Sequence, residues 1–236
     1  MIKRTICAVI AAAAAGCAYG SDLNNITRVT QGELHGIAED LGAAFSYKGV
    51  TPATPLGVTG FDIGVELTDT NVKNSSAFYA AGGGDPSDLF IPKIHVYKGL
   101  GWGFDIGGFV GGSSTTGATL VGLDLRYAFV DDGVATPAVA VRLSGTRAQD
   151  MGDLSLNTVG LDLMISKKLT VFTPYAGIGT VRVASGVTNS DLADEKFNKG
   201  RGFVGLNTNF LGANFAAEYE QMGSNPSVSV KIGLRF

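Results

Sequence analysis

His35 and His95 are the only histidines of the 236-residue chain and the first candidates for catalysis. A histidine acts as a general base when a carboxylate orients it and a nucleophile lies beside it. His95 lies between Lys93 and Tyr97 in a stretch of alternating side chains, and no Gly-x-Ser-x-Gly elbow accompanies it. The sequence therefore favours a buried polar network around His95, with a catalytic site near it as the alternative. His35 is expected to be solvated.

A second group of candidates is the loop SGVTNSDLADEKFNKG, where Asp191, Asp194 and Glu195 lie close together. Carboxylates bind Ca²⁺, but the loop lacks the Asp-x-Asp-x-Asp-Gly order of an EF-hand. The run Gly82-Gly83-Gly84-Asp85-Pro86 favours a flexible turn over a phosphate cradle, because no helix obviously follows it. The sequence thus predicts no metal site and no cofactor.

From residue 58 onward, apolar residues recur at every second position, which is typical of β-strands with two different faces. In TLVGLDLRYAFV (119–130), for example, the apolar side chains oppose Asp124 and Arg126. Stretches of this kind predict about ten antiparallel strands. The count rises to twelve if 41–48 and 77–81 are also strands. The longest gaps, 71–88 and 184–200, fall on the same side of the predicted strand array.

The last ten residues, SVSVKIGLRF, place Val228, Val230, Ile232, Leu234 and Phe236 on one face. This stretch resembles the closing strand of a bacterial outer-membrane β-barrel, in which a terminal aromatic residue is the insertion signal. The usual signal has a glycine where this chain has Lys231. The resemblance is generic. It implies a Gram-negative outer membrane, insertion by the barrel-insertion machinery, and contact with the bilayer and lipopolysaccharide.

Residues 1–20 combine Lys3 and Arg4 with an apolar stretch and small residues before Ser21, which predicts a signal peptide cleaved after Gly20. Two alternatives remain, lipidation at Cys17 and an uncleaved anchor. Cys7 and Cys17 are the only cysteines, so the cleaved chain would hold no disulfide.

Residues 21–57 are predicted to form a separate amino-terminal unit before a barrel at 58–236. A helix is expected over 29–41, because Thr30 and Glu33 fit a capping box and Leu34, Ile37 and Leu41 share a face. An irregular connector follows at 46–57. The helix lies either in the periplasm or in the barrel mouth as a plug.

Composition limits the possible environments and partners. Charged residues make up 17% of the chain against about 25% in ordinary globular domains, and the mean hydropathy is +0.21. After residue 20, no apolar run approaches the roughly 18 residues that suggest a membrane helix. Without Lys3 and Arg4, 16 basic residues (18 minus 2) face 21 acidic ones, a net charge of −5. This balance excludes nucleic acid as an expected partner. Nothing in the sequence indicates an oligomeric state.

The two strand faces fit either a membrane barrel or a soluble lipid-binding barrel of lipocalin type, and the signal peptide and Phe236 favour the membrane. The polar face is then predicted to line the lumen with a network of matched charges. Its members are Asp62, Glu66, Lys93, His95, Asp105, Asp124, Arg126, Arg142, Asp162, Glu218, Glu220, Lys231 and Arg235. Ten strands make a barrel narrower than the 16–18-stranded porins. A non-enzymatic structural protein or a narrow, porin-like passive channel is therefore expected.

Overall fold

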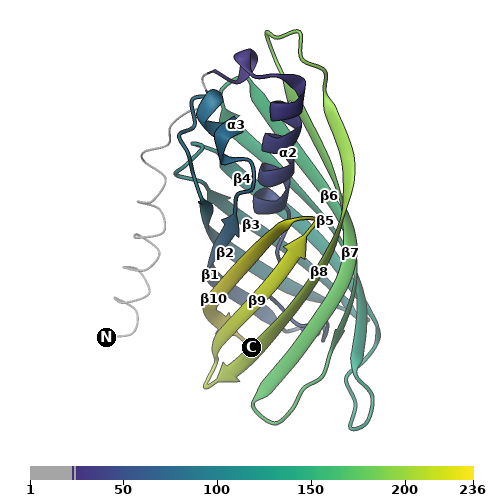
Figure 1. Ribbon diagram of the computed structural model, residues 1–236. Coiled ribbons are helices and arrows are strands. Elements are labelled where there is room, and N and C mark those ends of the chain that lie inside the picture. The colour runs from purple at the N-terminus through teal and green to yellow at the C-terminus, as the bar shows by residue number, and fades with distance from the viewer. Residues whose placement is uncertain (1–22, 24) are drawn as a thin grey trace, which may run out of the picture.

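Ten antiparallel strands close into a barrel in the computed structural model, which describes residues 23 and 25–236 (Figure 1). The predicted signal peptide lies outside these residues. The strands are β1 (Phe61–Asn71), β2 (Asp88–Gly101), β3 (Phe104–Gly112), β4 (Thr119–Val130), β5 (Ala138–Met151), β6 (Leu154–Ser166), β7 (Phe172–Val187), β8 (Glu195–Phe210), β9 (Ala213–Met222) and β10 (Asn225–Arg235). The preferred count of ten is confirmed, because 77–81 lies mostly in a helix and 41–45 continues another.

The terminal strand closes the barrel by pairing with the first, from Asp62 opposite Arg235 to Thr70 opposite Ser227. Phe61 and Phe236 complete this seam with reciprocal backbone hydrogen bonds of 2.7 and 3.0 Å. Glycine is required near the chain end, because a Cβ on Gly233 would lie 2.2 Å from the carbonyl oxygen of Ile63.

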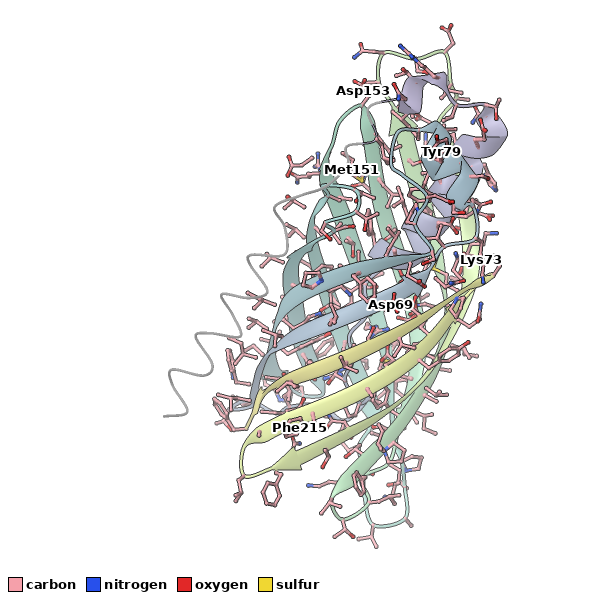
Figure 2. All side chains as sticks on the ribbon, turned by 60° about the vertical axis from the view of Figure 1, so that its left-hand side comes forward. Asp69, Lys73, Tyr79, Met151, Asp153 and Phe215 are labelled. Carbon is pink, nitrogen blue, oxygen red and sulfur yellow. The ribbon has the colours of Figure 1, made fainter. Side chains whose placement is uncertain are left out.

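The wall of the barrel is apolar outside and charged inside. On β4, for instance, Val121, Leu123 and Leu125 are exposed, whereas Asp124 and Arg126 between them are buried. Phe215 of β9 projects outward in the same way (Figure 2). A soluble barrel would have the opposite distribution, since exposed apolar area of this extent is unfavourable in water. The fold is therefore that of a transmembrane β-barrel.

The two ends of the barrel differ. One end, called the loop end here, carries segment 72–87 and segment 188–194. The other, the carboxyl end, carries Phe236 and the connections 102–103, 131–137, 167–171 and 211–212. The predicted gap at 184–200 was too long, because β7 and β8 stay paired as far as Ser185 and Glu195. The outward residues there include Arg182, Lys196 and Asn198, so the alternation that marks the membrane part of the strands fades.

Within the described residues, three helices precede or interrupt the strands: η1 (Ile26–Arg28), α2 (Gln31–Phe45) and α3 (Ser75–Ala80). Helix α2 begins at the predicted capping box, in which Thr30 and Glu33 exchange hydrogen bonds. These bonds hold the pKa of Glu33 below its usual value. The helix lies inside the loop end of the barrel (Figure 1), where Leu34, Ile37 and Leu41 are fully buried. No helix of the described part of the chain is long and apolar enough to cross a bilayer.

Candidate functional site: the filled lumen

The lumen contains the side chains that the strand alternation assigned to it. They are Asp62, Glu66, Lys93, His95, Asp105, Asp124, Arg126, Arg142, Asp162, Glu218, Glu220, Lys231 and Arg235. Each is at most 4% exposed, apart from Arg235, whose side chain is 10% exposed. Buried charges of this number require partners.

Two ion-pair groups line the wall beside the seam. Glu66 of β1 lies 2.7 Å from the ammonium of Lys93 and 2.7 Å from Nε2 of His95, both on β2. Asp62, four residues earlier on β1, lies 3.0 Å from Lys231 and 3.8 Å from Arg235 on β10. The two groups cross-link the lumen face of three adjacent strands.

Asp162 on β6 is the centre of a third group. One of its oxygens lies 2.9 Å from Nε of Arg142, and the other lies 2.6 Å from Nε of Arg201. Arg201, from β8, was absent from the predicted network. Its parity could have identified it, because Arg201 alternates with the outward-facing Val204 and Leu206.

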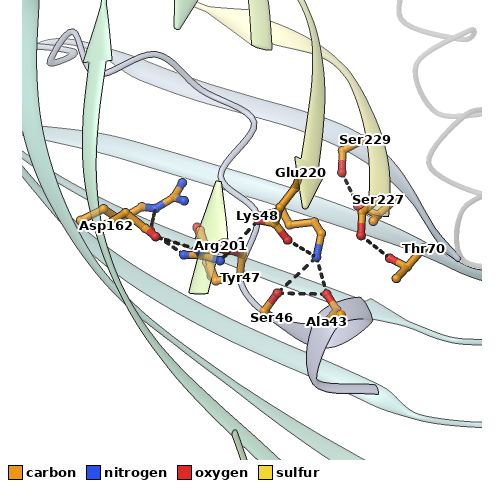
Figure 3. Close-up of polar contacts among 12 residues, drawn as sticks. Ala43, Ser46, Tyr47, Lys48, Thr70, Asp162, Arg201, Glu220, Ser227 and Ser229 are labelled. Atoms are coloured by element: carbon orange, nitrogen blue, oxygen red, sulfur yellow. Dashed lines mark hydrogen bonds and ion pairs between the residues drawn. The ribbon is translucent and has the colours of Figure 1, made fainter. Parts of the chain in front are cut away.

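A segment that contributes no strand to the wall fills the space between these groups. Helix α2 and the connector after it, residues 31–57, are called the luminal segment here. Figure 3 shows Lys48 of this segment between Glu220 of β9, at 3.1 Å, and the carbonyl oxygen of Ala43, at 2.6 Å. Arg201 reaches the segment as well, by donating to the carbonyl oxygen of Tyr47 at 2.8 Å.

Wall residues nearer the carboxyl end hold the rest of the connector. Tyr47 donates to Asp124 at 2.8 Å, and Arg126 donates to the carbonyl oxygen of Pro52 while pairing with Asp105. The amide of Leu56 donates to Asp105 at 3.1 Å. Asp105 and Arg126 therefore satisfy the backbone of the luminal segment as well as each other.

Asp40 anchors α2 at the loop end, and no sequence pattern singled it out. Its buried carboxylate accepts from the amides of Lys73 and Asn74, at 3.1 and 2.8 Å, and from the side chain of Asn225 at 2.5 Å. One carboxylate thus ties the helix to segment 72–87 and to the start of β10.

The other sequence candidates lie at the loop end. The His35 ring contacts Glu195 at 2.8 Å and Glu39 at 3.1 Å, so His35 is part of a contact between α2 and β8 and is not simply solvated. Asp194 pairs with Lys196 at 3.2 Å. Among the described residues, no group of three or more His, Cys, Asp or Glu side chains is arranged to hold a metal ion.

Phe236, the predicted insertion signal, is 71% exposed on the outer wall at the carboxyl end, and its ring lies 5.9 Å from that of Phe61. Other exposed aromatic residues near this end include Trp102, Tyr127 and Phe129. Aromatic side chains gather in this way where a barrel meets the membrane interface.

We expect His95→Ala to lower the free energy of unfolding by about 1–3 kcal/mol, because the buried Glu66 then loses the ring nitrogen at 2.7 Å and keeps only Lys93 and Thr68 as partners. Urea unfolding in lipid vesicles measures the loss, and His95→Gln, which retains a donor, should recover part of it. A hydrolytic activity that His95→Ala abolished without changing stability would contradict the network role.

No protein-family profile matches the chain, and no curated protein is similar to it in sequence. Among solved structures, it is similar to the translocator domain of the autotransporter NalP from Neisseria meningitidis, with 13% identity, 87% of this chain and 95% of that chain covered, and a TM-score of 0.43. It is also similar to the KdgM porin, with 10% identity, 75% of this chain and 99% of that chain covered, and a TM-score of 0.38. Ail of Yersinia pestis, in complex with the heparin analogue sucrose octasulfate, is similar with 12% identity, 75% of this chain and 98% of that chain covered, and a TM-score of 0.32.

These identities and TM-scores transfer no ligand, partner or activity to the chain. The wall itself gives the class of protein: a closed, even-stranded barrel with an apolar exterior, a charged lumen and a terminal aromatic residue. By fold, the chain is a transmembrane β-barrel of the outer-membrane type.

Proposed function

We propose that the protein is a non-enzymatic barrel of the outer membrane whose lumen is closed at rest by the luminal segment. In this proposal the carboxyl end faces the periplasm, where the strand ending at Phe236 is recognised by the insertion machinery. The loop end faces lipopolysaccharide and the outside. Residues 1–20 serve as the signal peptide. The barrel is structural, or passes small solutes only when the luminal segment moves.

The observation that carries this proposal is the use of wall charges as partners for the backbone of the luminal segment. Arg201 and Arg126 donate to the carbonyl oxygens of Tyr47 and Pro52, and Asp105 accepts from the amide of Leu56. In an open pore, those charges would line a water-filled channel and set its ion selectivity. Here they face protein, which supports a closed resting state.

A disulfide between α2 and the wall tests this proposal. A Cβ on Gly42 would lie 3.5 Å from the Cβ of Val183 on β7, within the range of disulfide geometry. We expect Gly42→Cys/Val183→Cys to cross-link on oxidation. In planar bilayers, the unaltered barrel should show no steady conductance, and any brief openings should disappear on cross-linking and return on reduction.

The single variant Val183→Cys is the matched control, since it carries the wall substitution without the cross-link. It also avoids the clash of Gly42→Cys alone, in which the added Cβ would lie 2.7 Å from Cγ2 of Val183. Steady conductance of the unaltered barrel that persists in the cross-linked variant would overturn the proposal, because solute would then pass beside a fixed luminal segment.

A further inference from the structure

We infer that residues 23–60 cross the barrel in addition to its ten strands, so that the barrel displays its own amino-terminal segment on the outer surface of the cell. The inference rests on the orientation given under the proposed function, in which the loop end is outside. It assigns the barrel a surface-display role that a closed wall alone would not have.

The first described residues are bound to both long segments of the loop end. The amide of Asn25 donates to the carbonyl oxygen of Ala81 at 2.9 Å, in segment 72–87. The Gln31 side chain exchanges hydrogen bonds of 3.1 and 3.0 Å with the backbone of Ala193, in segment 188–194. Leu23 is fully buried. The chain therefore enters the described structure at the loop end.

The next contacts follow the wall toward the opposite end. Strand β4 runs from the loop end at Thr119 to the carboxyl end at Val130. Tyr47 contacts Asp124 on this strand, and Pro52 contacts Arg126, which is closer to the carboxyl end. The order of contacts along the connector thus matches the order of residues down the barrel.

The connector leaves the lumen at the carboxyl end. Leu56 bonds to Asp105, at the start of β3, and the Lys98 ammonium, near the end of β2, lies 3.1 Å from the carbonyl oxygen of Gly60. Phe61 then pairs with Phe236. Residues 23 and 61 consequently lie at opposite ends of the barrel, as Figure 1 shows for the helices at one end and the C-terminus at the other.

Because the number of strands is even, the passage of residues 23–60 through the lumen is a crossing in addition to those of the strands. The start of β1 and the end of β10 must share one side of the membrane, and both lie at the carboxyl end. A segment that stayed on that side would need no passage through the lumen. Residues 23–60 make that passage, with ion pairs and hydrogen bonds to the wall along its length, so they are fixed within the barrel.

Single cysteines labelled in intact cells with a membrane-impermeant maleimide test the inference. Arg28→Cys reports the amino-terminal segment, Tyr79→Cys reports segment 72–87 of the loop end, and Val134→Cys reports the carboxyl end. All three residues are exposed, so the substitutions leave the core unchanged. The unaltered chain gives the background from its own cysteines, and heat-modifiable gel migration shows that each variant is folded.

We expect the Arg28→Cys and Tyr79→Cys variants to label in intact cells, and the Val134→Cys variant to label only after the outer membrane is permeabilised. Labelling of Tyr79→Cys alone in intact cells would overturn the inference and leave the orientation standing. Labelling of Val134→Cys alone would overturn the orientation, and the inference with it.

Discussion

Replacing Asp162 by alanine is expected to lower the free energy of unfolding of the barrel by about 3–5 kcal/mol. Asp162 lies between Arg142 and Arg201, and all three side chains are buried. Removal of the carboxylate leaves two guanidinium groups without their main partner in the lumen. Such a loss is larger than that of an exposed ion pair, because water cannot take the place of the carboxylate. Urea unfolding in lipid vesicles, followed by the fluorescence of Trp102, the only tryptophan, measures the change.

Asp191→Ala is the matched control, since Asp191 is an exposed acidic residue of the loop end. It should change the free energy of unfolding by no more than about 0.5 kcal/mol. Asp162→Asn keeps hydrogen-bond acceptance and should fall between the two. A loss below about 1 kcal/mol for Asp162→Ala would show that water reaches the two arginines, and that this part of the lumen is not dry.

Reversing the charge of Lys48 is expected to open the barrel. Lys48→Glu places a carboxylate beside Glu220, now 3.1 Å from the ammonium, in a part of the lumen where both side chains are almost fully buried. Like charges at such a contact cost several kcal/mol. A cost of about 3 kcal/mol shifts the ratio of closed to open barrels by about a hundredfold. Planar-bilayer recordings should therefore show steady conductance in this variant.

The double variant Lys48→Glu/Glu220→Gln is the control that separates charge repulsion at this contact from general damage. It removes the facing carboxylate without placing a second cation beside Arg201, which lies 3.6 Å from Glu220, and should return the recordings toward the closed state. Addition of the Gly42→Cys/Val183→Cys cross-link to Lys48→Glu should reduce the conductance as well. Equal conductance in Lys48→Glu and in Lys48→Glu/Glu220→Gln would show that repulsion between the two carboxylates does not open the barrel.

The wall of this barrel could be predicted from its sequence because membrane strands impose a strict period of two. Outward residues such as Leu123 face lipid and inward residues such as Asp124 face the lumen. Their alternation can therefore be recognised from one strand alone, without knowing which strands pair with it. Beyond the bilayer, that constraint ends. Near the ends of β7 and β8 the outer face carries Arg182, Lys196 and Asn198 in place of large apolar residues, and no pattern in the sequence therefore indicates that the two strands continue.

The luminal segment could be predicted only in part, because its environment comes from distant strands. The capping box identified the start of α2, but the helix continues past Leu41 to Phe45, where Ser46 caps it through hydrogen bonds to Gly42 and Ala43. Lys48 follows in a stretch without periodicity. Its partner, Glu220, lies on a strand that the sequence places far away, and only the closed barrel brings them together.

The seam between β1 and β10 has a consequence for the order of folding. It joins the first strand to the last, so its contacts are the most distant in sequence of all the strand pairings, and such contacts are slow to form because the intervening chain must first be ordered. If the seam closed first, α2 and the connector would have to be drawn end-first through a finished ring. We therefore expect the amino-terminal residues to pack against the open sheet early, and β1 and β10 to pair around them last. The luminal segment would then act as the template on which the strands assemble into the closed barrel.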